Sequence, residues 1–420
     1  MKILYVSQYF PPEMGAPAAR VAELSRHWVR SGHQVTVLTG FPNHPTGVVP
    51  PEYRRALRRL VMREEVQGVN VVRTWLWSLP NRRAHERMLN YSSFCLSAAA
   101  AGLCVERPDV VIATSPQLLV GLAGWWVARW KHVPLLFEVR DLWPESLAAV
   151  GVGGENSLLH RALGRIADFL YRESTRVVVV TPAFAEHLVK HRQVPRKKIA
   201  VVENGVETEL FSPRAASGLR RELGAEGKFV VCYIGTMGMA HGLETLVEAA
   251  ARLQRTMPDV LFLLVGEGAD KERMQKLASS RGLSNLLFVS QQPRERIPDY
   301  ISASDACLVL LKKAELFKTV IPTKLLEFMS CARPVILGVD GQARSIMEDA
   351  GAGIFVQPES VGDLTRAIMR LASDASLRET LGRNGRRYIV EHFSRAQTAT
   401  IYLDVLERAI HGERRQQAAA

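Results

Sequence analysis

The sequence predicts an α/β protein built from two doubly wound parallel sheets, each in its own domain. At 420 residues the chain is longer than one hydrophobic core usually supports, so two domains are expected. Short apolar runs alternate with longer amphipathic stretches in both halves of the chain. This alternation is typical of repeated strand–helix–strand units, in which helices cover a parallel sheet.

The N-terminal half opens with a strand at Lys2–Ser7, a helix over 18–31 and a strand at Gln34–Thr39. The loop after the first strand contains Gly15 and lies where open α/β sheets bind ligands. Gly15 either lets the backbone approach a ligand or only turns the chain. Later strands are expected at Val110–Thr114, Leu135–Val139 and Arg176–Thr181 and from Ile199 onward, with a helix over 118–130.

The stretch Phe137–Ser146 places charged groups at the carboxyl end of a buried strand. Arg140 and Asp141 follow that strand directly. An arginine and carboxylates in this position suit a sugar hydroxyl or a phosphate group. A purely structural Arg140–Asp141 ion pair is the alternative.

A second series of strands and helices follows a polar turn at Asn204 and Gly205. Its first two strands run into glycine-containing loops at Gly235–Gly242 and Gly266–Gly268. The expected domains are 1–205 and 206–395, with a final helix and tail over 396–420. The strands are expected at Phe229–Gly235, Val260–Val265, Leu286–Val289, Ala306–Leu311 and Pro334–Gly338, with helices over 243–255, 271–282 and 397–410.

A helix is predicted to begin at Pro322, whose fixed φ suits a first helical turn. The free N–H groups of that turn and the helix dipole favour an anion. Lys324 lies in the same turn, and Glu327 lies three residues further on the same face. Together they suit a phosphate joined to a hydroxyl-bearing ring. The alternative is an amphipathic helix with a solvated Lys–Glu pair.

The excess of positive charge is concentrated in the N-terminal half. The net charge is +12, and residues 1–203 hold 26 Lys and Arg against 16 Asp and Glu. The basic residues are not interleaved with aromatic residues in a nucleic-acid-binding module, so an anionic membrane or a lipid-phosphate acceptor is favoured. Arg54–Arg63 has its apolar residues at helical spacing, and Trp75 and Trp77 follow. This pattern predicts an interfacial amphipathic helix, with a solvated surface helix as the alternative.

The cysteines and apolar runs indicate where the protein acts. The five cysteines form no CxxC motif, which favours reduced thiols in the cytosol over disulfides or a metal site. The longest apolar runs, Phe94–Val105 and Leu118–Ala128, are too short to span a bilayer. We therefore expect a cytoplasmic protein that associates peripherally with the cytoplasmic membrane.

Six motifs occur in order along the chain: Gln8–Gly15, Phe137–Ser146, Asn204–Glu207, Gly266–Gly268, Phe317–Lys324 and Pro322–Glu327. Together they resemble those of the retaining GT-B glycosyltransferases of family four, over nearly the whole chain. Within that family the sequence is most similar to the branch that makes bacterial O-antigen, capsule and colanic-acid sugars.

The resemblance implies two Rossmann-like domains facing a central cleft, with the final helix crossing back to the first domain. The C-terminal domain would bind a nucleotide-sugar donor, with a UDP-sugar favoured over a GDP-sugar. The N-terminal domain would bind a lipid-linked saccharide acceptor at the inner membrane surface. No cofactor, metal or nucleic acid is implied.

The resemblance also assigns roles to individual residues. Lys324, Arg140 and Asp141 would be catalytic. Lys324 and the helix N-terminus would hold the donor diphosphate, and Glu327 the ribose hydroxyls. The residues expected to bind the donor are Gly15, Thr236, His241, Gly266, Glu267, Thr323 and Glu327.

Four positions depart from the family pattern. Thr319 replaces the first Glu of the Glu-x7-Glu pair that ends at Glu327, so the identity of the donor sugar is open. Arg140 stands where relatives often carry a His. Thr236 and His241 stand where relatives commonly hold the diphosphate with Arg and Lys, so Lys324, Arg140, His241 and backbone dipoles would supply the positive charge instead.

We expect transfer of a hexosyl or N-acetylaminosugar residue with retention and without a metal. The charge of Lys324 and the helix end would stabilise the leaving diphosphate. Two alternatives remain open. One is a nucleotide-sugar 2-epimerase, which also has two such domains. The other is a catalytically silent sugar-nucleotide-binding subunit, which the departures permit.

Overall fold

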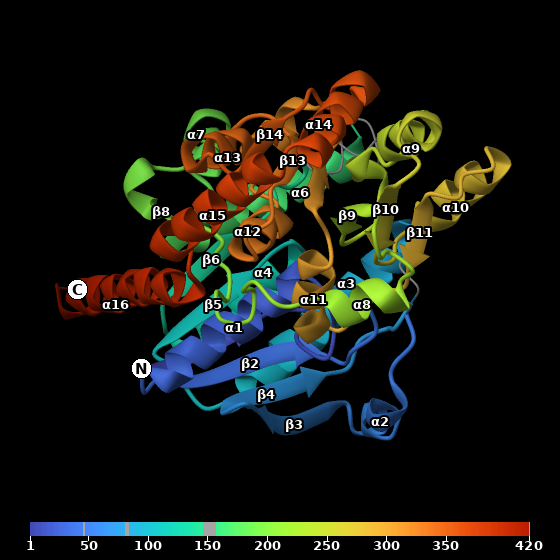
Figure 1. The fold of residues 1–420 in the computed structure, drawn as a ribbon. Helices are drawn as coiled ribbons and strands as arrows, with labels where there is room; N and C mark the ends of the chain where they lie inside the picture. Colours follow the sequence, from blue (N-terminus) through green and yellow to red (C-terminus); the bar gives the residue numbers. More distant parts are fainter. Residues whose placement is uncertain (45–46, 80–83, 146–156, 420) are drawn as a thin grey trace. The chain divides into compact units, whose positions relative to one another are not determined.

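The computed structural model describes residues 1–44, 47–79, 84–145 and 157–419 (Figure 1). The chain divides into two compact units. Unit 1 comprises Met1–Asn204 and Arg395–Ala420, and unit 2 comprises Gly205–Ser394. The units divide one residue before each of the boundaries expected from the sequence. None of the helices in the described part of the chain is long and apolar enough to span a membrane.

Unit 1 is built on an eight-stranded sheet in the order β3-β4-β2-β1-β5-β6-β7-β8. Neighbouring strands are parallel except for β3, which pairs antiparallel with β4. The strands are β1 (Lys2–Val6), β2 (Gln34–Gly40), β3 (Val61–Val66), β4 (Val69–Thr74), β5 (Val110–Thr114), β6 (Leu135–Val139), β7 (Arg176–Val179) and β8 (Ile199–Val201).

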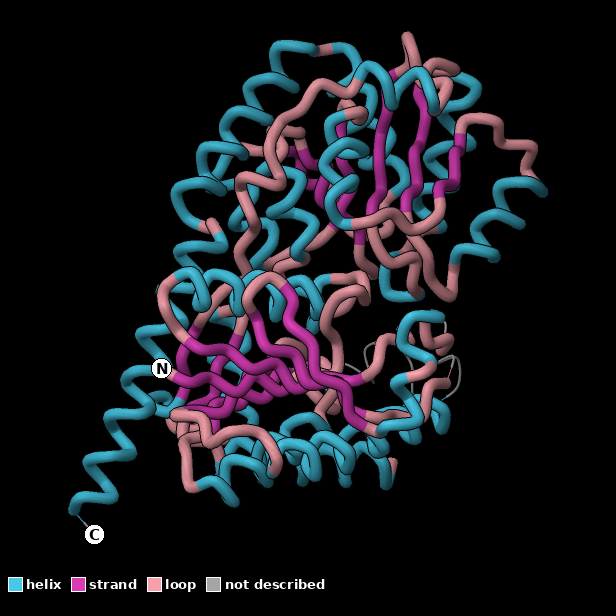
Figure 2. Tube along the Cα trace, turned by 90° about the horizontal axis from the view of Figure 1, so that it is seen from below, coloured by secondary structure: helices cyan, strands magenta, loops and turns pink. Residues whose placement is uncertain are grey.

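Helices lie on both faces of this sheet (Figure 2). The helices of unit 1 are α1 (Ala16–Arg30), α2 (Pro51–Arg54), α3 (Ala84–Leu103), α4 (Leu119–Lys131), α6 (Leu158–Glu173), α7 (Pro182–Arg192) and α16 (Arg395–Ala419), with 3-10 turns η1 (Ala56–Arg59) and η2 (Arg196–Lys198). On one face, Trp28 of α1 is buried between Tyr5 and Tyr402, and its Nε1 donates to Ala399 O of α16 (3.0 Å). The last helix therefore packs on the first unit.

The amphipathic helix predicted over Arg54–Arg63 is wrong. Helix α2 ends at Arg54, η1 follows, and Leu60 adopts a left-handed φ of 60° before β3 begins at Val61. Gln67 and Gly68 both have positive φ and join β3 to β4 in a two-residue hairpin. Pairing with β4 therefore prevails over the local helical spacing of the apolar residues.

Unit 2 is built on an all-parallel, six-stranded sheet in the order β11-β10-β9-β12-β13-β14. Its strands are β9 (Phe229–Ile234), β10 (Val260–Val265), β11 (Leu286–Val289), β12 (Ala306–Leu310), β13 (Val335–Gly338) and β14 (Gly353–Phe355). Its helices are α8 (Ser217–Glu222), α9 (Glu244–Thr256), α10 (Lys271–Ser280), α11 (Ile297–Ser302), α12 (Thr323–Ser330), α13 (Gln342–Ala350), α14 (Val361–Ser373) and α15 (Ala375–His392), with η3 (Met239–His241), η4 (Arg294–Arg296) and η5 (Glu315–Thr319). The prediction of two doubly wound sheets is confirmed.

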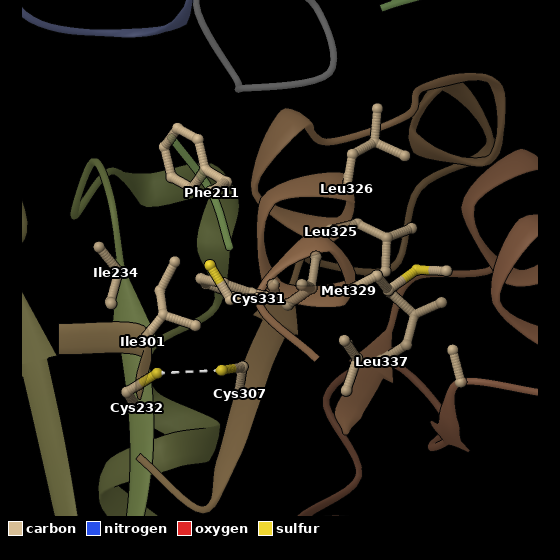
Figure 3. Close-up of a cluster of buried hydrophobic side chains, with 14 of the residues drawn as sticks. Phe211, Cys232, Ile234, Ile301, Cys307, Leu325, Leu326, Met329, Cys331 and Leu337 are labelled. Carbon is tan, nitrogen blue, oxygen red and sulfur yellow. Dashed lines mark hydrogen bonds between the residues drawn. The ribbon is translucent and has the colours of Figure 1, made fainter. Parts of the chain in front are cut away.

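Helix α12 is anchored in the core of unit 2. Pro322 is its N-cap, so the helix begins one residue later than predicted, and it ends before the strand β13, as predicted. Figure 3 shows Leu325 and Met329 of α12 in the same buried cluster as Leu337 of β13. This packing fixes the first turn of α12, which carries Lys324.

The five cysteines are free thiols with different degrees of burial. Cys232, Cys307 and Cys331 are buried in unit 2, and the Sγ atoms of Cys232 and Cys307 lie 3.3 Å apart (Figure 3). Cys104 is exposed. The three buried cysteines belong to one cluster of buried hydrophobic residues, so they act as small core residues.

Candidate functional site

Two glycine-containing loops meet at the carboxyl ends of β9 and β10. Met237 N donates to Glu267 O (2.8 Å), and Asp270 N donates to Met237 O (2.9 Å). Gly266 has a φ of 146°, and a Cβ there would lie 2.1 Å from Gly235 O. Only glycine permits this close approach of the two backbones. Gly266 therefore supports the shape of the site, and nothing in these contacts requires it to touch a ligand.

Lys324 projects from α12 onto an aromatic ring of β9. Its Nζ lies 3.9 Å from the centroid of the Tyr233 ring. The Nζ atom is buried, and no described residue accepts a hydrogen bond from it. A Cβ at Gly235 would lie 2.8 Å from Nζ, so the glycine leaves room for the amine. The alternative of a solvated Lys–Glu pair is wrong.

Burial lowers the pKa of Lys324 to about 7, although nearby Glu327 opposes the shift. The amine is desolvated, lies on the face of an aromatic ring and has no hydrogen-bond acceptor among the described residues, so the attraction of Glu327 does not make up for the lost hydration. A phosphate beside it would supply the missing acceptor and favour the ammonium form. The local structure thus suits an anion.

His241 lies beside this amine but does not add positive charge. Burial and the neighbouring Lys324 lower the pKa of His241 to about 3, so its imidazole is neutral at pH 7. Its Nδ1 lies 3.4 Å from Leu310 O, which can only accept, so Nδ1 carries the proton and Nε2 is left as an acceptor. Without a bound anion His241 therefore brings no charge to this site, and its part in neutralising a donor phosphate stays a prediction.

Thr236 acts through its backbone. Its carbonyl accepts a hydrogen bond from Tyr233 Oη (2.7 Å). The Tyr233 ring also meets the His241 ring edge-on, with centroids 5.9 Å apart. Thr236 and His241 thereby hold the ring that lies under Lys324. Tyr233 was not predicted from the sequence, although a tyrosine two residues before a glycine loop at a strand end was a usable signal.

Glu327 is paired with an arginine from another loop. Its Oε1 accepts from Arg294 Nη1 (2.9 Å), and the Arg294 guanidinium lies 4.8 Å from the Phe211 ring centroid. This contact fixes the carboxylate in a nearly buried position. Arg294 lies in η4, after β11, and its position at the carboxyl edge was its only signal in the sequence.

The remaining predicted residues of unit 2 lie nearby but have local roles. The Glu267 carboxylate pairs with Lys271 Nζ (2.6 Å). Thr323 is the first residue of α12. The Thr319 hydroxyl donates to Leu316 O (2.6 Å) and so closes η5.

In unit 1 the predicted residues gather at the carboxyl ends of β1 and β6. Gly15 is the N-cap of α1, with a φ of 129°. Arg140 donates through Nη2 to Ala16 O (3.2 Å) and through Nη1 to Pro17 O (3.4 Å). Arg140 thus holds the first turn of α1. Burial raises the pKa of Asp141 to about 6, while Arg140 opposes the shift.

A buried ion pair that was not predicted from the sequence lies beside these residues. Arg20 of α1 donates to Glu138 Oε1 through Nε (3.0 Å) and Nη2 (2.8 Å). Tyr5 and Thr114 donate to the other carboxylate oxygen. Burial alone would raise the pKa of Glu138, but Arg20 and Arg140 outweigh it and hold the pKa below its usual value. A glutamate inside an otherwise apolar strand was the available signal.

Unit 1 also contains a network of buried amide side chains. Gln8 and Asn43 follow β1 and β2, Gln117 follows β5, and Asn90 lies on α3. Gln117 Nε2 donates to Gln8 Oε1 (2.6 Å), and Asn90 Nδ2 donates to Asn43 Oδ1 (3.1 Å). Gln8 Nε2 donates to Asn90 Oδ1 and joins the two pairs. Amides at this edge are typical partners of sugar hydroxyls.

The predicted residues therefore form one group in each unit. Lys324, Glu327 and the two glycine loops lie together in unit 2, and Gly15, Arg140 and Asp141 lie together in unit 1. Among the residues that the structure describes, no group of three His, Cys, Asp or Glu side chains is placed to hold a metal ion.

Comparison with known proteins identifies the family of both units. Residues 15–205 match the model of the glycosyl transferase 4-like domain, and residues 218–388 match that of the glycosyl transferases group 1. The putative colanic acid biosynthesis glycosyl transferase WcaI of Escherichia coli (strain K12) is 25% identical over 380 residues, which cover 88% of this chain and 91% of WcaI. The D-inositol 3-phosphate glycosyltransferase of Nocardia farcinica is 29% identical over 311 residues, which cover 70% of this chain and 66% of the relative.

Solved structures share the fold over the whole chain. Sucrose-phosphate synthase from Thermosynechococcus elongatus superposes with a TM-score of 0.76 at 21% identity and covers all of both chains. Anabaena Alr3699/HepE, in complex with UDP and glucose, superposes with a TM-score of 0.73 at 18% identity, covering 97% of this chain and 99% of HepE. The chain is therefore a glycosyltransferase of the GT-B fold, with a glycosyl transferase 4-like domain as its N-terminal part and a glycosyl transferases group 1 domain as its C-terminal part.

Proposed function

We propose that this enzyme moves a hexosyl or N-acetylaminosugar residue from a nucleotide sugar to a lipid-linked saccharide, with retention and without a metal ion. The observation that carries the proposal is the buried Lys324 amine, which has no hydrogen-bond acceptor among the described residues and lies in the first turn of α12. A donor diphosphate would satisfy both the amine and the free N–H groups of that turn.

The chemistry follows from where negative charge develops. The bond between the anomeric carbon and the diphosphate oxygen breaks, and the acceptor oxygen bonds to the same face of that carbon. The leaving diphosphate becomes more negative, so Lys324 and the helix end stabilise the transition state more than the ground state. The acceptor proton passes to the released diphosphate.

The other groups of unit 2 would bind and orient the donor. Glu327, held by Arg294, is placed as an acceptor for ribose hydroxyls. His241 Nε2 is a neutral acceptor, suited to a sugar hydroxyl. Thr236, Gly266, Glu267 and Thr323 would shape the site, chiefly through the backbone.

Unit 1 is proposed to bind the acceptor at the carboxyl edge of its sheet. The amide network of Gln8, Asn43, Asn90 and Gln117 lies at this edge, where amide groups suit saccharide hydroxyls. Asp141, with a pKa raised to about 6, is a further hydroxyl partner there. Arg140 is proposed to position the N-terminus of α1 rather than to contact phosphate directly.

Two relatives support the finer assignments. WcaI is described as a putative colanic acid biosynthesis glycosyl transferase, which favours a role in surface polysaccharide synthesis. A lipid-linked acceptor would place this role at the cytoplasmic membrane. HepE is described as a complex with UDP and glucose, which favours a UDP-sugar donor.

The test is a transfer assay with purified protein, UDP- and GDP-sugars and lipid-linked saccharides. Donors are first ranked by thermal stabilisation, since a bound ligand raises apparent stability. We expect a product whose anomeric configuration, read by NMR, matches that of the donor. Conversion of the nucleotide sugar without acceptor would identify an epimerase, and binding without hydrolysis or transfer would identify a silent subunit. Inversion would refute the retaining mechanism.

A further inference from the structure

Helix α3 presents an uncharged face to solvent. No charged residue occurs between Met88 and Cys104. Leu96 of this segment is 73% exposed and Leu89 is 43% exposed. A surface helix of a soluble domain normally carries charged residues on its outer face. The outer face of α3 therefore needs an explanation other than contact with water.

The neighbouring helix α4 extends this face. Trp130 is 62% exposed and Trp126 is 44% exposed, and their rings stack with centroids 6.4 Å apart. With Arg129 and His132 they line a surface notch of about 340 Å³. The two helices are in close contact, since a Cβ on Gly102 of α3 would lie 2.4 Å from the Val127 side chain of α4.

The same surface continues on both sides of α3 and α4. The segment after β4 lies along α3, because Trp77 N donates to Ser93 Oγ (2.8 Å). On the other side, the Trp125 ring meets the Phe169 ring of α6 edge-on, with centroids 5.0 Å apart. Leu158, at the start of α6, is exposed.

The rim of this surface is basic. Arg129, Arg161 and Arg165 are exposed on α4 and α6. Three acidic residues of these elements or next to them are paired with other cations: Glu106 with Lys2, Asp168 with Arg192, and Glu173 with Arg172. Glu86, in the first turn of α3, is half-buried. The three exposed arginines therefore leave a net positive charge around an apolar centre.

We propose that the outer face of α3, α4 and the start of α6, which we call the lipid-docking face, binds the surface of an anionic bilayer. Exposed Trp flanked by Arg is the composition of membrane interfaces. Arginine at the rim complements anionic headgroups and loses that attraction as salt screens it. A second copy of the chain is disfavoured, because a two-fold contact would oppose the same arginines.

This inference rests on the proposed function, since an enzyme with a lipid-linked acceptor must reach the membrane surface. It also moves the membrane contact predicted from the sequence. Arg54–Arg63 forms no continuous helix, whereas α3 and α4 are long, adjacent and apolar on their outer side. We therefore expect the arginines of Arg54–Arg63 to contribute little.

The test measures sedimentation of the full chain with vesicles of phosphatidylglycerol and phosphatidylcholine at low salt. The triple variant Leu96→Gln, Trp126→Gln, Trp130→Gln should lower the partition coefficient by at least about tenfold, since it removes exposed apolar groups that the bilayer would bury. The matched control Met369→Gln, Val390→Gln, Ile401→Gln changes three exposed apolar residues elsewhere on the chain and should bind as the wild type does.

Two further variants separate the two candidate surfaces. Arg129→Gln, Arg161→Gln, Arg165→Gln should weaken binding to anionic vesicles and reduce its salt dependence. Arg54→Gln, Arg55→Gln, Arg58→Gln, Arg59→Gln should keep wild-type binding. The proposal would be overturned if the quadruple arginine variant lost vesicle binding while the Leu96→Gln, Trp126→Gln, Trp130→Gln variant bound as the wild type does. Sedimentation velocity tests for a dimer. A wild-type dimer that is lost only in the Leu96→Gln, Trp126→Gln, Trp130→Gln variant would also overturn the proposal, because it would assign the face to a second copy of the chain.

Separate readouts keep this inference apart from the proposed function. UDP-sugar affinity and transfer to a detergent-soluble acceptor should be unchanged in the triple variant, because its residues lie outside the donor-binding loops. Vesicle binding by the lipid-docking face, without any sugar transfer, would refute the proposed function alone. Sugar transfer by a wild-type protein that does not bind vesicles would refute the lipid-docking face alone.

Discussion

The Lys324 amine lies 3.9 Å from the centroid of the Tyr233 ring and has no hydrogen-bond acceptor among the described residues. An amine in this environment is destabilised when charged, because the ring replaces only part of the hydration that burial removes. Binding of a diphosphate would reverse this cost. The same contact therefore makes Lys324 a poor contributor to stability and a strong candidate for anion binding.

Replacing Lys324 with Ala should lower the transfer rate by about 10²- to 10³-fold, the scale for loss of one preorganised charge-stabilising group. The volume-matched Lys324→Met should have the same defect with an intact fold, since it removes an amine that has no partner among the described residues. Steady-state kinetics measures the transfer rate, and amide exchange in β9 and β12 shows whether the fold is intact. Near-normal turnover in either variant would remove Lys324 from the mechanism.

Binding of UDP at pH 8 should take up protons. Free Lys324 has a pKa of about 7 and is mostly neutral at pH 8, whereas a bound diphosphate favours the ammonium form and raises the pKa. The uptake should vanish below about pH 6, where the free amine is already charged. Calorimetry in buffers of different ionisation enthalpy measures it, with Lys324→Met as the control. Equal uptake by the variant would place the diphosphate elsewhere.

The fold was predictable because parallel strands buried on both faces appear as apolar runs. β10, with the sequence Val-Leu-Phe-Leu-Leu-Val, is fully buried and lies at its predicted position. Arg54–Arg63 could not be predicted in the same way. Its local spacing is helical, but its structure depends on pairing of β3 with β4, which the positive φ of Gln67 and Gly68 sets up.

The position of the site could be predicted from the sequence, but the burial and the partners of its side chains could not. The first turn of α12 could be located from Pro322 and the apolar residues that follow. Burial of Lys324 depends on Tyr233 and Gly235, which are far away in the sequence, and pairing of Glu327 with Arg294 depends on a loop after another strand. The neutral state of His241 follows from the same burial. Which of these residues touch the donor stays a prediction.

Arg294→Met should weaken donor binding more than it slows the chemical step. The arginine holds the Glu327 carboxylate through a charged hydrogen bond, whose loss costs about 1.5–3 kcal/mol. Since the ribose does not react, the loss should appear as a KM increased by about ten- to a hundredfold with kcat nearly unchanged. Arg294→Lys should recover part of the affinity. A defect in kcat alone would contradict the positioning role.

Transfer should persist in excess EDTA. The proposed mechanism assigns the stabilisation of the leaving diphosphate to Lys324 and the N–H groups of α12, without a divalent cation. Activity measured before and after chelation checks this, with added Mg²⁺ or Mn²⁺ as the comparison. Loss of transfer with EDTA and its recovery with either cation would show that a metal ion carries the diphosphate charge.

Glu138→Gln should destabilise unit 1 by about 3–5 kcal/mol, the cost of breaking a buried ion pair. All five N–H donors of Arg20 are used: two bonds reach Glu138, and the other three reach Val202 O, Glu203 O and Asn204 Oδ1. The substitution keeps the volume but leaves the buried arginine without its counter-charge. Arg20 also holds residues 202–204, where the first part of unit 1 ends. The loss of stability should therefore extend from β6 to these residues.

This loss can be measured in unit 1 alone. All seven tryptophans lie between Trp28 and Trp143, so intrinsic fluorescence during urea unfolding reports only that unit. Glu173→Gln is the matched control, since it breaks the exposed Arg172–Glu173 pair in the same unit and should cost at most about 1 kcal/mol. If both variants unfold at a similar urea concentration, the Arg20 guanidinium does not need the charge of Glu138, and the buried pair does not stabilise unit 1.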